Sequence, residues 1–142
     1  MYLLDTNVLS EMRKYESGRI DRAVAAWVRS VAKEDLYLSV MTIMEIELGI
    51  AKLERHDAPQ AALLRRWLRE HVEPVFSDAL LPLDLSIARR CGPLHVPDPR
   101  PERDAWIAAT ALEHDLIVAT RNGKDFAGTG VTIVNPWDHP LS

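Results

Sequence analysis

Short apolar runs of strand length recur along the chain, and we expect strands at residues 2–4, 36–38, 80–83, 116–119 and 131–134. The first run, Tyr2-Leu3-Leu4, ends abruptly at Asp5, which is typical of a buried strand that leads into a turn. The last two runs are rich in Ile and Val, as buried strands usually are.

Between these runs the apolar residues follow a helical period, which predicts helices at about 21–33, 41–55, 59–71, 86–91 and 102–114. In the segment 41–55, for example, Ile43, Ile46 and Ile50 fall on one face, and Ser39 just before it is suited to cap the helix. The segment 102–114 is apolar nearly all round, so we expect it to be buried. Proline and glycine mark the stretch 92–101 as an irregular loop, and 121–130 as another.

Strands that alternate with helices predict a mostly parallel central sheet with helices on both faces. The sequence contains no internal repeat and no flexible linker, and 142 residues leave room for one domain. We therefore expect one α/β sandwich domain that spans residues 1–142.

The charge balance limits the class of function. The chain has 17 basic and 21 acidic residues, a net charge of −4. Such a balance argues against a domain that coats nucleic acid by bulk positive charge, but not against an enzyme that reaches nucleic acid through a metal ion. A single cysteine, Cys91, excludes an internal disulfide, and we expect it to be buried filler. Without a signal sequence or an apolar run that could span a membrane, the expected location is the cytoplasm.

Four acidic residues fall where the strands and helices meet. Asp5 follows the first strand, Glu45 lies about one helical turn after the second, Asp104 is in the first turn of the buried helix, and Asp125 is in the loop after residue 119. Ligand sites of open α/β sheets lie beyond the carboxyl ends of the strands, so these four carboxylates are expected to converge at one edge.

Carboxylates at close range repel one another unless a cation neutralises them. Oxygen ligands without histidine suit Mg²⁺ or Mn²⁺ better than zinc. A metal held in this way can lower the pKa of a bound water and offset charge on phosphoryl oxygens, which is the chemistry of phosphodiester hydrolysis.

Each acid also has a purely structural interpretation. Asp5 is placed to cap the following helix, Thr42 and Glu45 have the T-x-x-E spacing of a capping box, Asp104 is an ordinary helix-start acid, and Asp125 an ordinary turn residue. The functional interpretation depends on all four reaching the same edge of the sheet.

Two tryptophans, Trp27 and Trp67, fall on apolar helical stripes and are expected in the core. The row of Arg65, Arg66 and Arg69 is either a solvated helix face or a contact for RNA phosphates.

Four blocks of sequence, in order and at plausible spacing, resemble the PIN-domain ribonucleases: Leu3–Glu11, Ser39–Gly49, Arg103–Ala111 and Ala119–Phe126. The terminal Val134-Asn135-Pro136-Trp137 is similar to the VapC and FitB branch of that family. The resemblance covers nearly the whole chain, and it implies a PIN-like three-layer sandwich.

The resemblance also implies an Mg²⁺- or Mn²⁺-dependent endoribonuclease of the toxin type, hydrolysing RNA. The resemblance implies that the toxin forms a homodimer. It also implies that a cognate antitoxin blocks its activity, and that the pair contacts DNA only through the antitoxin. In these toxins the antitoxin's tail packs into a groove between early helices. The resemblance therefore implies a second role for Trp27 or Trp67, which is to line that groove.

Carried over by position, Asp5 and Asp104 are metal ligands, Glu45 binds or orients the metal-bound water, and Asp125 completes the acidic site. The resemblance further implies polar residues that line the site: Asn7, Thr120 and Asn122. The Pro-rich loop 92–101 departs from relatives, which place more helix there.

Two functions other than RNA hydrolysis share part of this pattern. A phosphatase of the D-x-D type fails because Asn7 stands where the second aspartate is needed. A non-catalytic RNA-binding or scaffold domain of the same fold stays open as the alternative, although such domains commonly lack one or more of the site acids.

Overall fold

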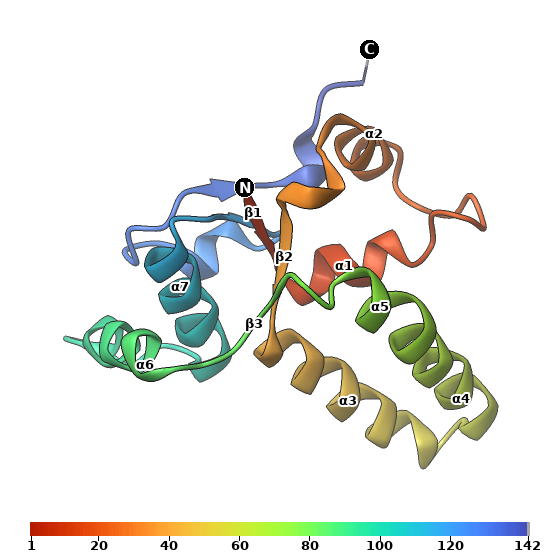
Figure 1. Cartoon of the computed structure of the whole chain (residues 1–142), viewed down its shortest axis with the longest axis horizontal. Coiled ribbons are helices and arrows are strands. Elements are labelled where there is room, and N and C mark those ends of the chain that lie inside the picture. Colours follow the sequence, from red (N-terminus) through yellow and green to blue (C-terminus); the bar gives the residue numbers. More distant parts are fainter. Residues whose placement is uncertain (142) are drawn as a thin grey trace.

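The computed structural model describes residues 1–141 and folds them around a five-stranded sheet (Figure 1). The strands are β1 (Tyr2–Leu4), β2 (Leu36–Ser39), β3 (Leu80–Leu81), β4 (Ile117–Ala119) and β5 (Ile133–Val134). They lie in the order β3-β2-β1-β4-β5, and each neighbouring pair is parallel. The expected parallel α/β architecture is confirmed.

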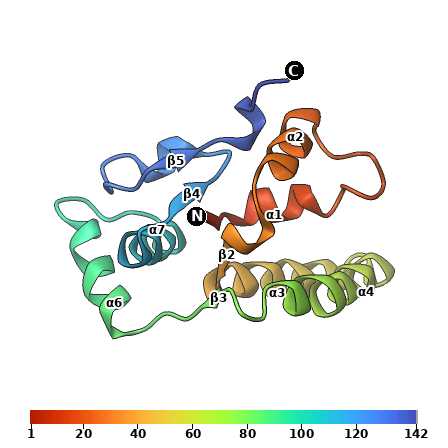
Figure 2. The same ribbon diagram turned by 45° about the horizontal axis from the view of Figure 1, so that its top comes forward.

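The helices are α1 (Thr6–Met12), α2 (Arg22–Ser30), α3 (Val40–Glu54), α4 (Ala58–Trp67), α5 (Glu73–Val75), α6 (Leu85–Cys91) and α7 (Glu102–His114). Short 3₁₀ turns occur at Lys33–Asp35, Gly92–His95, Gly123–Phe126 and Pro136–Asp138. In Figure 2, α6 and α7 lie on one side of the central strands, and α1 and α2 lie on the other.

Neighbouring residues of β1 point to opposite faces of the sheet and so enter two different cores. Leu4, beside Ala119 of β4, packs in the core that contains Trp27 of α2 and Ile46 of α3. Leu3, one residue earlier, packs with Ile107 of α7 on the other face. This alternation produces the three layers of helix, sheet and helix, and it confirms the expected sandwich.

The start of α3 settles one alternative from the sequence. The Met41 N–H donates to Ser39 Oγ at 3.0 Å, so Ser39 is the N-cap, as expected. Thr42 therefore lies inside the helix, and the capping box with Glu45 is wrong. The Thr42 side chain is fully buried, and among the described residues its hydroxyl has no hydrogen-bond partner.

Other element boundaries differ from the sequence prediction. The helix expected at 59–71 continues past Trp67 as a π-helical turn, Leu68–Val72, because Leu68 and Val72 are both anchored in the core. The strand expected at 80–83 is limited to two residues, since Pro82 has no N–H to donate. The strand expected at 131–134 begins only at Ile133.

The two predicted loops are more ordered than expected, and Arg100 joins them. The stretch 92–101 opens with a 3₁₀ turn, and 121–130 contains another. Arg100 donates from Nε to the Leu94 carbonyl and from Nη1 to the Ala127 carbonyl, both at 2.8 Å. These bonds fix the chain that leads into α7, and therefore the position of its first turn.

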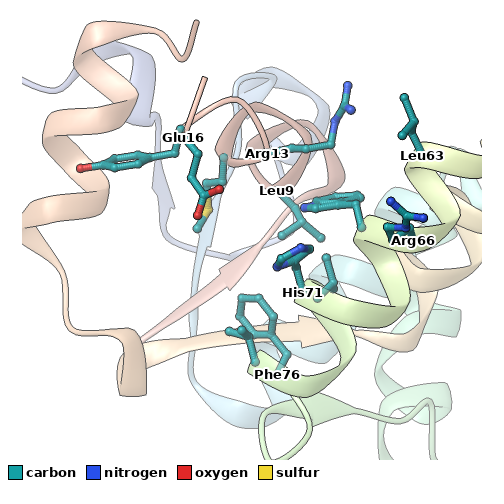
Figure 3. A pocket seen from close by; sticks show the side chains of 12 residues that line it. Leu9, Arg13, Glu16, Leu63, Arg66, His71 and Phe76 are labelled. Carbon is teal, nitrogen blue, oxygen red and sulfur yellow. The ribbon is translucent and has the colours of Figure 1, made fainter. Parts of the chain in front are cut away.

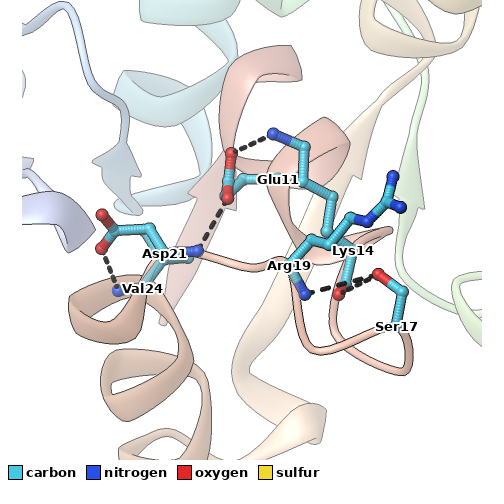
Figure 4. Close-up of polar contacts among 6 residues, drawn as sticks. All are labelled: Glu11, Lys14, Ser17, Arg19, Asp21 and Val24. Carbon is cyan, nitrogen blue, oxygen red and sulfur yellow. Dashed lines mark hydrogen bonds and ion pairs between the residues drawn. The ribbon is translucent and has the colours of Figure 1, made fainter.

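Hydrogen bonds of charged side chains hold the connection between α1 and α2 in place (Figure 4). The Glu11 carboxylate accepts from Lys14 Nζ at 3.0 Å and from the Asp21 N–H at 2.8 Å. Asp21 in turn caps α2, because its Oδ1 accepts from the N–H groups of Ala23 and Val24. The orientation of α1, which begins directly after Asp5, is thus held at its far end as well.

Across residues 1–141, no helix is both long and apolar enough to cross a membrane.

The unpaired hydroxyl of Thr42 gives a stability prediction. Replacing Thr42 with Val keeps the side-chain shape and removes a buried polar group, so the free energy of unfolding should rise by about 1 kcal/mol. Urea denaturation of the two proteins measures the change. Thr110→Val is the matched control, since Thr110 is equally buried but donates to the Trp106 carbonyl at 2.8 Å. A Thr42→Val variant no more stable than Thr110→Val would contradict the assignment.

Candidate functional site

The carboxyl edge of the sheet gathers the polar residues that the sequence singled out. Asp5 follows β1 and Thr120 follows β4, the strand paired with it. Glu45 lies in the second turn of α3, Asp104 in the first turn of α7 and Asp125 in the 3₁₀ turn after β4. Each element that the sequence argument required therefore stands where it was expected.

Asp5 is the most enclosed of the four acids, with 9% of its surface exposed. Its Oδ2 accepts from Thr120 Oγ1 at 2.7 Å and from Asn7 Nδ2 at 3.4 Å, and its Oδ1 accepts from the Thr6 N–H at 2.9 Å. The last bond caps α1, so the structural interpretation of Asp5 is correct as well. A carboxylate with these donors is fixed in orientation at the edge of the sheet.

The polar residues expected beside Asp5 form one network. Asn7 Nδ2 also donates to Thr120 Oγ1 at 3.4 Å, and the Arg121 N–H donates to Asn7 Oδ1 at 3.2 Å. Asn122 joins through its backbone, whose N–H donates to Thr120 Oγ1 at 3.1 Å. Asn7 and Thr120 therefore contact the carboxylate directly, whereas Asn122 acts through Thr120.

Glu45 has two partners that sequence reasoning missed. Thr6 Oγ1 donates to its Oε1 at 3.1 Å, and Arg103 Nη1 lies 3.9 Å from its Oε2. Both partners are next in sequence to a site acid, Thr6 to Asp5 and Arg103 to Asp104. That adjacency was the one signal that pointed to them.

The four acids affect one another electrostatically. Burial raises the pKa of Asp5, and the charge of Asp125 raises it further, against the hydrogen bonds from Thr120 and Thr6. Burial likewise raises the pKa of Glu45 and of Asp104; Asp5 adds to both shifts. Repulsion of this kind is relieved by a proton or by a cation.

Within residues 1–141, no three His, Cys, Asp or Glu side chains are grouped closely enough to form a metal centre as they stand. The donor set nevertheless fits a hard divalent ion, because the groups whose charges raise one another's pKa are all carboxylates, the oxygen ligands that such an ion prefers. Of the four, Asp5 is already held in orientation by neighbouring donors, as metal-ligating carboxylates usually are.

Two hollows are lined by residues of α1 and α4, and the smaller one reaches the site acid Glu45. One, about 280 Å³, is lined by Thr6 and Glu45 on one side and by Arg13 and Trp67 on the other. Arg13 and Trp67 also line the second hollow, about 430 Å³, and the two hollows with this shared lining are here called the groove. The Arg13 guanidinium lies 6.0 Å from the centre of the Trp67 ring.

Figure 3 shows the larger hollow, where Leu9 of α1 and Arg13, directly after α1, face Leu63 and Arg66 of α4. Trp27 is in the core, as expected, whereas Trp67 is half-buried: it packs against the edge of the same core and also lines this groove. Arg65, by contrast, is on the solvated face and pairs with Glu54 at 2.8 Å.

Comparison with known proteins identifies the family. The family model described as the PIN domain matches residues 2–131 of the chain. The chain belongs to the PIN-domain family. The resemblance noted in the sequence is thus confirmed over nearly the whole length of the chain.

Similar PIN-domain proteins cover the chain almost end to end. The VapC ribonuclease Y4jK of Sinorhizobium fredii is 36% identical, over 97% of this chain and 99% of its own length. The toxin FitB of Neisseria gonorrhoeae is 37% identical, over 96% and 99%. The solved structure of FitAB bound to an IR36 DNA fragment superposes with a TM-score of 0.84 at 32% identity, over 99% of both chains.

The raised pKa of Asp104 makes a prediction about stability and pH. The folded PIN domain keeps this proton to higher pH than the unfolded chain, so stability falls as pH rises through the interval between the two pKa values. In metal-free buffer, Asp104→Asn should therefore raise the melting temperature near pH 7 and have no such effect below about pH 3, where the group is protonated in both states.

Thermal unfolding at the two pH values measures the difference. The control is Glu102→Gln, which removes the same charge from the same turn of α7; the charge of Glu102 acts on Cys91 rather than on the acids. An equal gain in both variants, or a gain that persists in acid, would contradict the proposed repulsion.

Proposed function

We propose that this chain is a divalent-metal-dependent endoribonuclease and the toxin of a toxin–antitoxin pair. The proposal is carried by the four carboxylates, Asp5, Glu45, Asp104 and Asp125, whose charges reach one another at the carboxyl edge of a PIN-domain sheet. The full-length similarity to a protein named as a ribonuclease and to one named as a toxin supports it.

In the proposed site, Asp5 and Asp104 would hold Mg²⁺ or Mn²⁺. A bound ion of this kind would supply an activated water and offset charge on the phosphoryl oxygens. Glu45 would orient the water, with Thr6 fixing its Oε1 at 3.1 Å. Thr120 and Asn7 would keep the Asp5 carboxylate turned toward the site. Asp125 would add negative charge, since it acts on both Asp5 and Asp104.

The alternative is a non-catalytic RNA-binding or scaffold domain of the same fold. We favour the enzyme because all four acids are present and Asp5 is buried with donors arranged around it, a costly arrangement for a domain without chemistry. A scaffold would show no Mn²⁺-dependent gain in thermal stability, since nothing would bind the ion.

Loss of one ligand tests the enzyme directly. Asp104→Asn should reduce Mg²⁺-dependent cleavage of a labelled RNA at least about a hundredfold, because the ion would lose a charged ligand. Cleavage is followed on denaturing gels with and without chelator. Glu102→Gln, two residues earlier in the same turn of α7, should keep parental activity. Equal cleavage by Asp104→Asn and the parent would exclude this site.

We further propose that an antitoxin binds the groove shared by Arg13 and Trp67. Its larger hollow combines exposed apolar side chains, Leu63 and Val75, with the positive charge of Arg66. An apolar groove rimmed by charge is suited to a protein segment. The solved FitAB–DNA assembly is consistent with a partner that makes the DNA contacts. A homodimer, implied by the family, stays a prediction that sedimentation equilibrium can check.

A charge placed in the groove should separate inhibition from catalysis. Leu63, on α4, has 55% of its surface exposed, so Leu63→Asp should fold normally and cleave RNA as before. Its co-purification with a co-expressed cognate antitoxin should be lost, because the carboxylate would have to be buried unpaired. Leu85→Asp on α6 is the control, at 64% exposure and outside the groove. Retained co-purification of Leu63→Asp would place the antitoxin elsewhere.

A further inference from the structure

Arg103 precedes Asp104 in sequence and pairs with Glu45, so it lies beside two of the site acids. Among the ion pairs of residues 1–141, the pair between Arg103 and Glu45 is the one that involves a site acid. RNA brings further negative charge to an edge that already carries four carboxylates. A cation of the protein at this place is therefore positioned to meet either the carboxylates or the substrate.

The pairing of Arg103 with Glu45 is loose. Their closest atoms are 3.9 Å apart, whereas Arg65 lies 2.8 Å from Glu54. Within the described part of the chain, the Arg103 side chain donates no hydrogen bond. Its exposed fraction is 48%. Its guanidinium thus keeps its donors available, and the planar fork of an arginine matches the oxygens of a phosphate.

The stability of the fold does not account for this arginine. Arg103 lies in the first turn of α7, where the helix dipole disfavours a positive charge. An exposed pair at 3.9 Å adds little to stability. Removing the side chain should therefore leave the folded state as stable as before, or slightly more so.

We infer that Arg103 is a phosphate-binding residue of the active site, which turns from Glu45 to a backbone phosphate of the RNA when substrate binds. This inference rests on the proposed ribonuclease function and specifies how that site receives its substrate. Glu45 holds the guanidinium beside the acids until the phosphate replaces it. The contact would bind RNA of any sequence, because a phosphate carries no base identity.

Binding is measured separately from cleavage. A fluorescein-labelled single-stranded RNA is titrated in Ca²⁺ by fluorescence anisotropy at several salt concentrations, and a gel verifies that the RNA stays intact. Arg103→Ala should weaken binding about tenfold at low salt and reduce the slope of log affinity against log salt by about one. Arg103→Lys should restore the slope with only part of the affinity, since it keeps the charge without the fork.

The control is Arg55→Ala. Arg55 is an exposed arginine just after α3, about 15 Å along that helix from Glu45, and it should change neither quantity. The melting temperature of each variant should be no lower than that of the parent. If Arg103→Ala keeps the parental slope, or if it behaves like Arg55→Ala, the inference is wrong.

A second measurement separates phosphate binding from a role in neutralising Glu45 alone. Mn²⁺ affinity is determined by electron paramagnetic resonance without RNA. A changed Mn²⁺ affinity with an unchanged RNA salt slope would assign Arg103 to Glu45 and overturn the inference. Failure of the parental chain to cleave RNA would instead overturn the ribonuclease function, and the binding measurement would still decide whether Arg103 contacts phosphate.

Discussion

The hydrogen bond from Thr120 to Asp5 is the contact on which the site depends. It joins residues 115 positions apart in sequence, at the ends of the adjacent parallel strands β1 and β4. A buried carboxylate is expensive unless donors surround it, and here the donors come from β4, from Asn7 and from the start of α1. The Asp5 N–H also donates to the Ala119 carbonyl at 2.9 Å, which continues the ladder of the two strands by one residue. Asp5 therefore extends the pairing of β1 with β4, caps the start of α1 and supplies a carboxylate to the site.

The other acids are positioned relative to this fixed charge. Glu45 and Asp104 come from helices on opposite faces of the sheet, α3 and α7, and both meet the charge of Asp5. A site assembled from both layers requires that the layers keep their spacing. The two cores on either side of β1 supply that constraint, because Leu3 and Leu4 anchor the strand to both.

Hydrophobic periodicity was sufficient for the architecture and for the places of the acids, but not for their partners. The run Tyr2-Leu3-Leu4 before Asp5 and the periodic stripe of α3 predicted a strand, a turn and a helix that the structure contains. The bond from Thr6 to Glu45 spans 39 positions, and no local pattern encodes it. The half-burial of Trp67 at the edge of the core was missed for a related reason: a stripe indicates which side of a helix is apolar, but not how fully another element covers it. The capping box failed because Ser39 begins α3 three residues earlier than Thr42.

The net charge of −4 equals the charge of the four site acids, so the rest of the chain is balanced. RNA is then not drawn to this protein by a broad basic surface, and attraction must act close to the centre. The loosely held guanidinium of Arg103 is a local cation of the required kind, and the proposed divalent ion would be another. The two differ in what they ask of the carboxylates. The ion needs them as ligands, whereas Arg103 needs Glu45 only until a phosphate is present. A site of this design would have affinity for RNA chiefly when its metal is bound, and the loop that positions α7, tied down by Arg100, would then matter as much as the acids themselves.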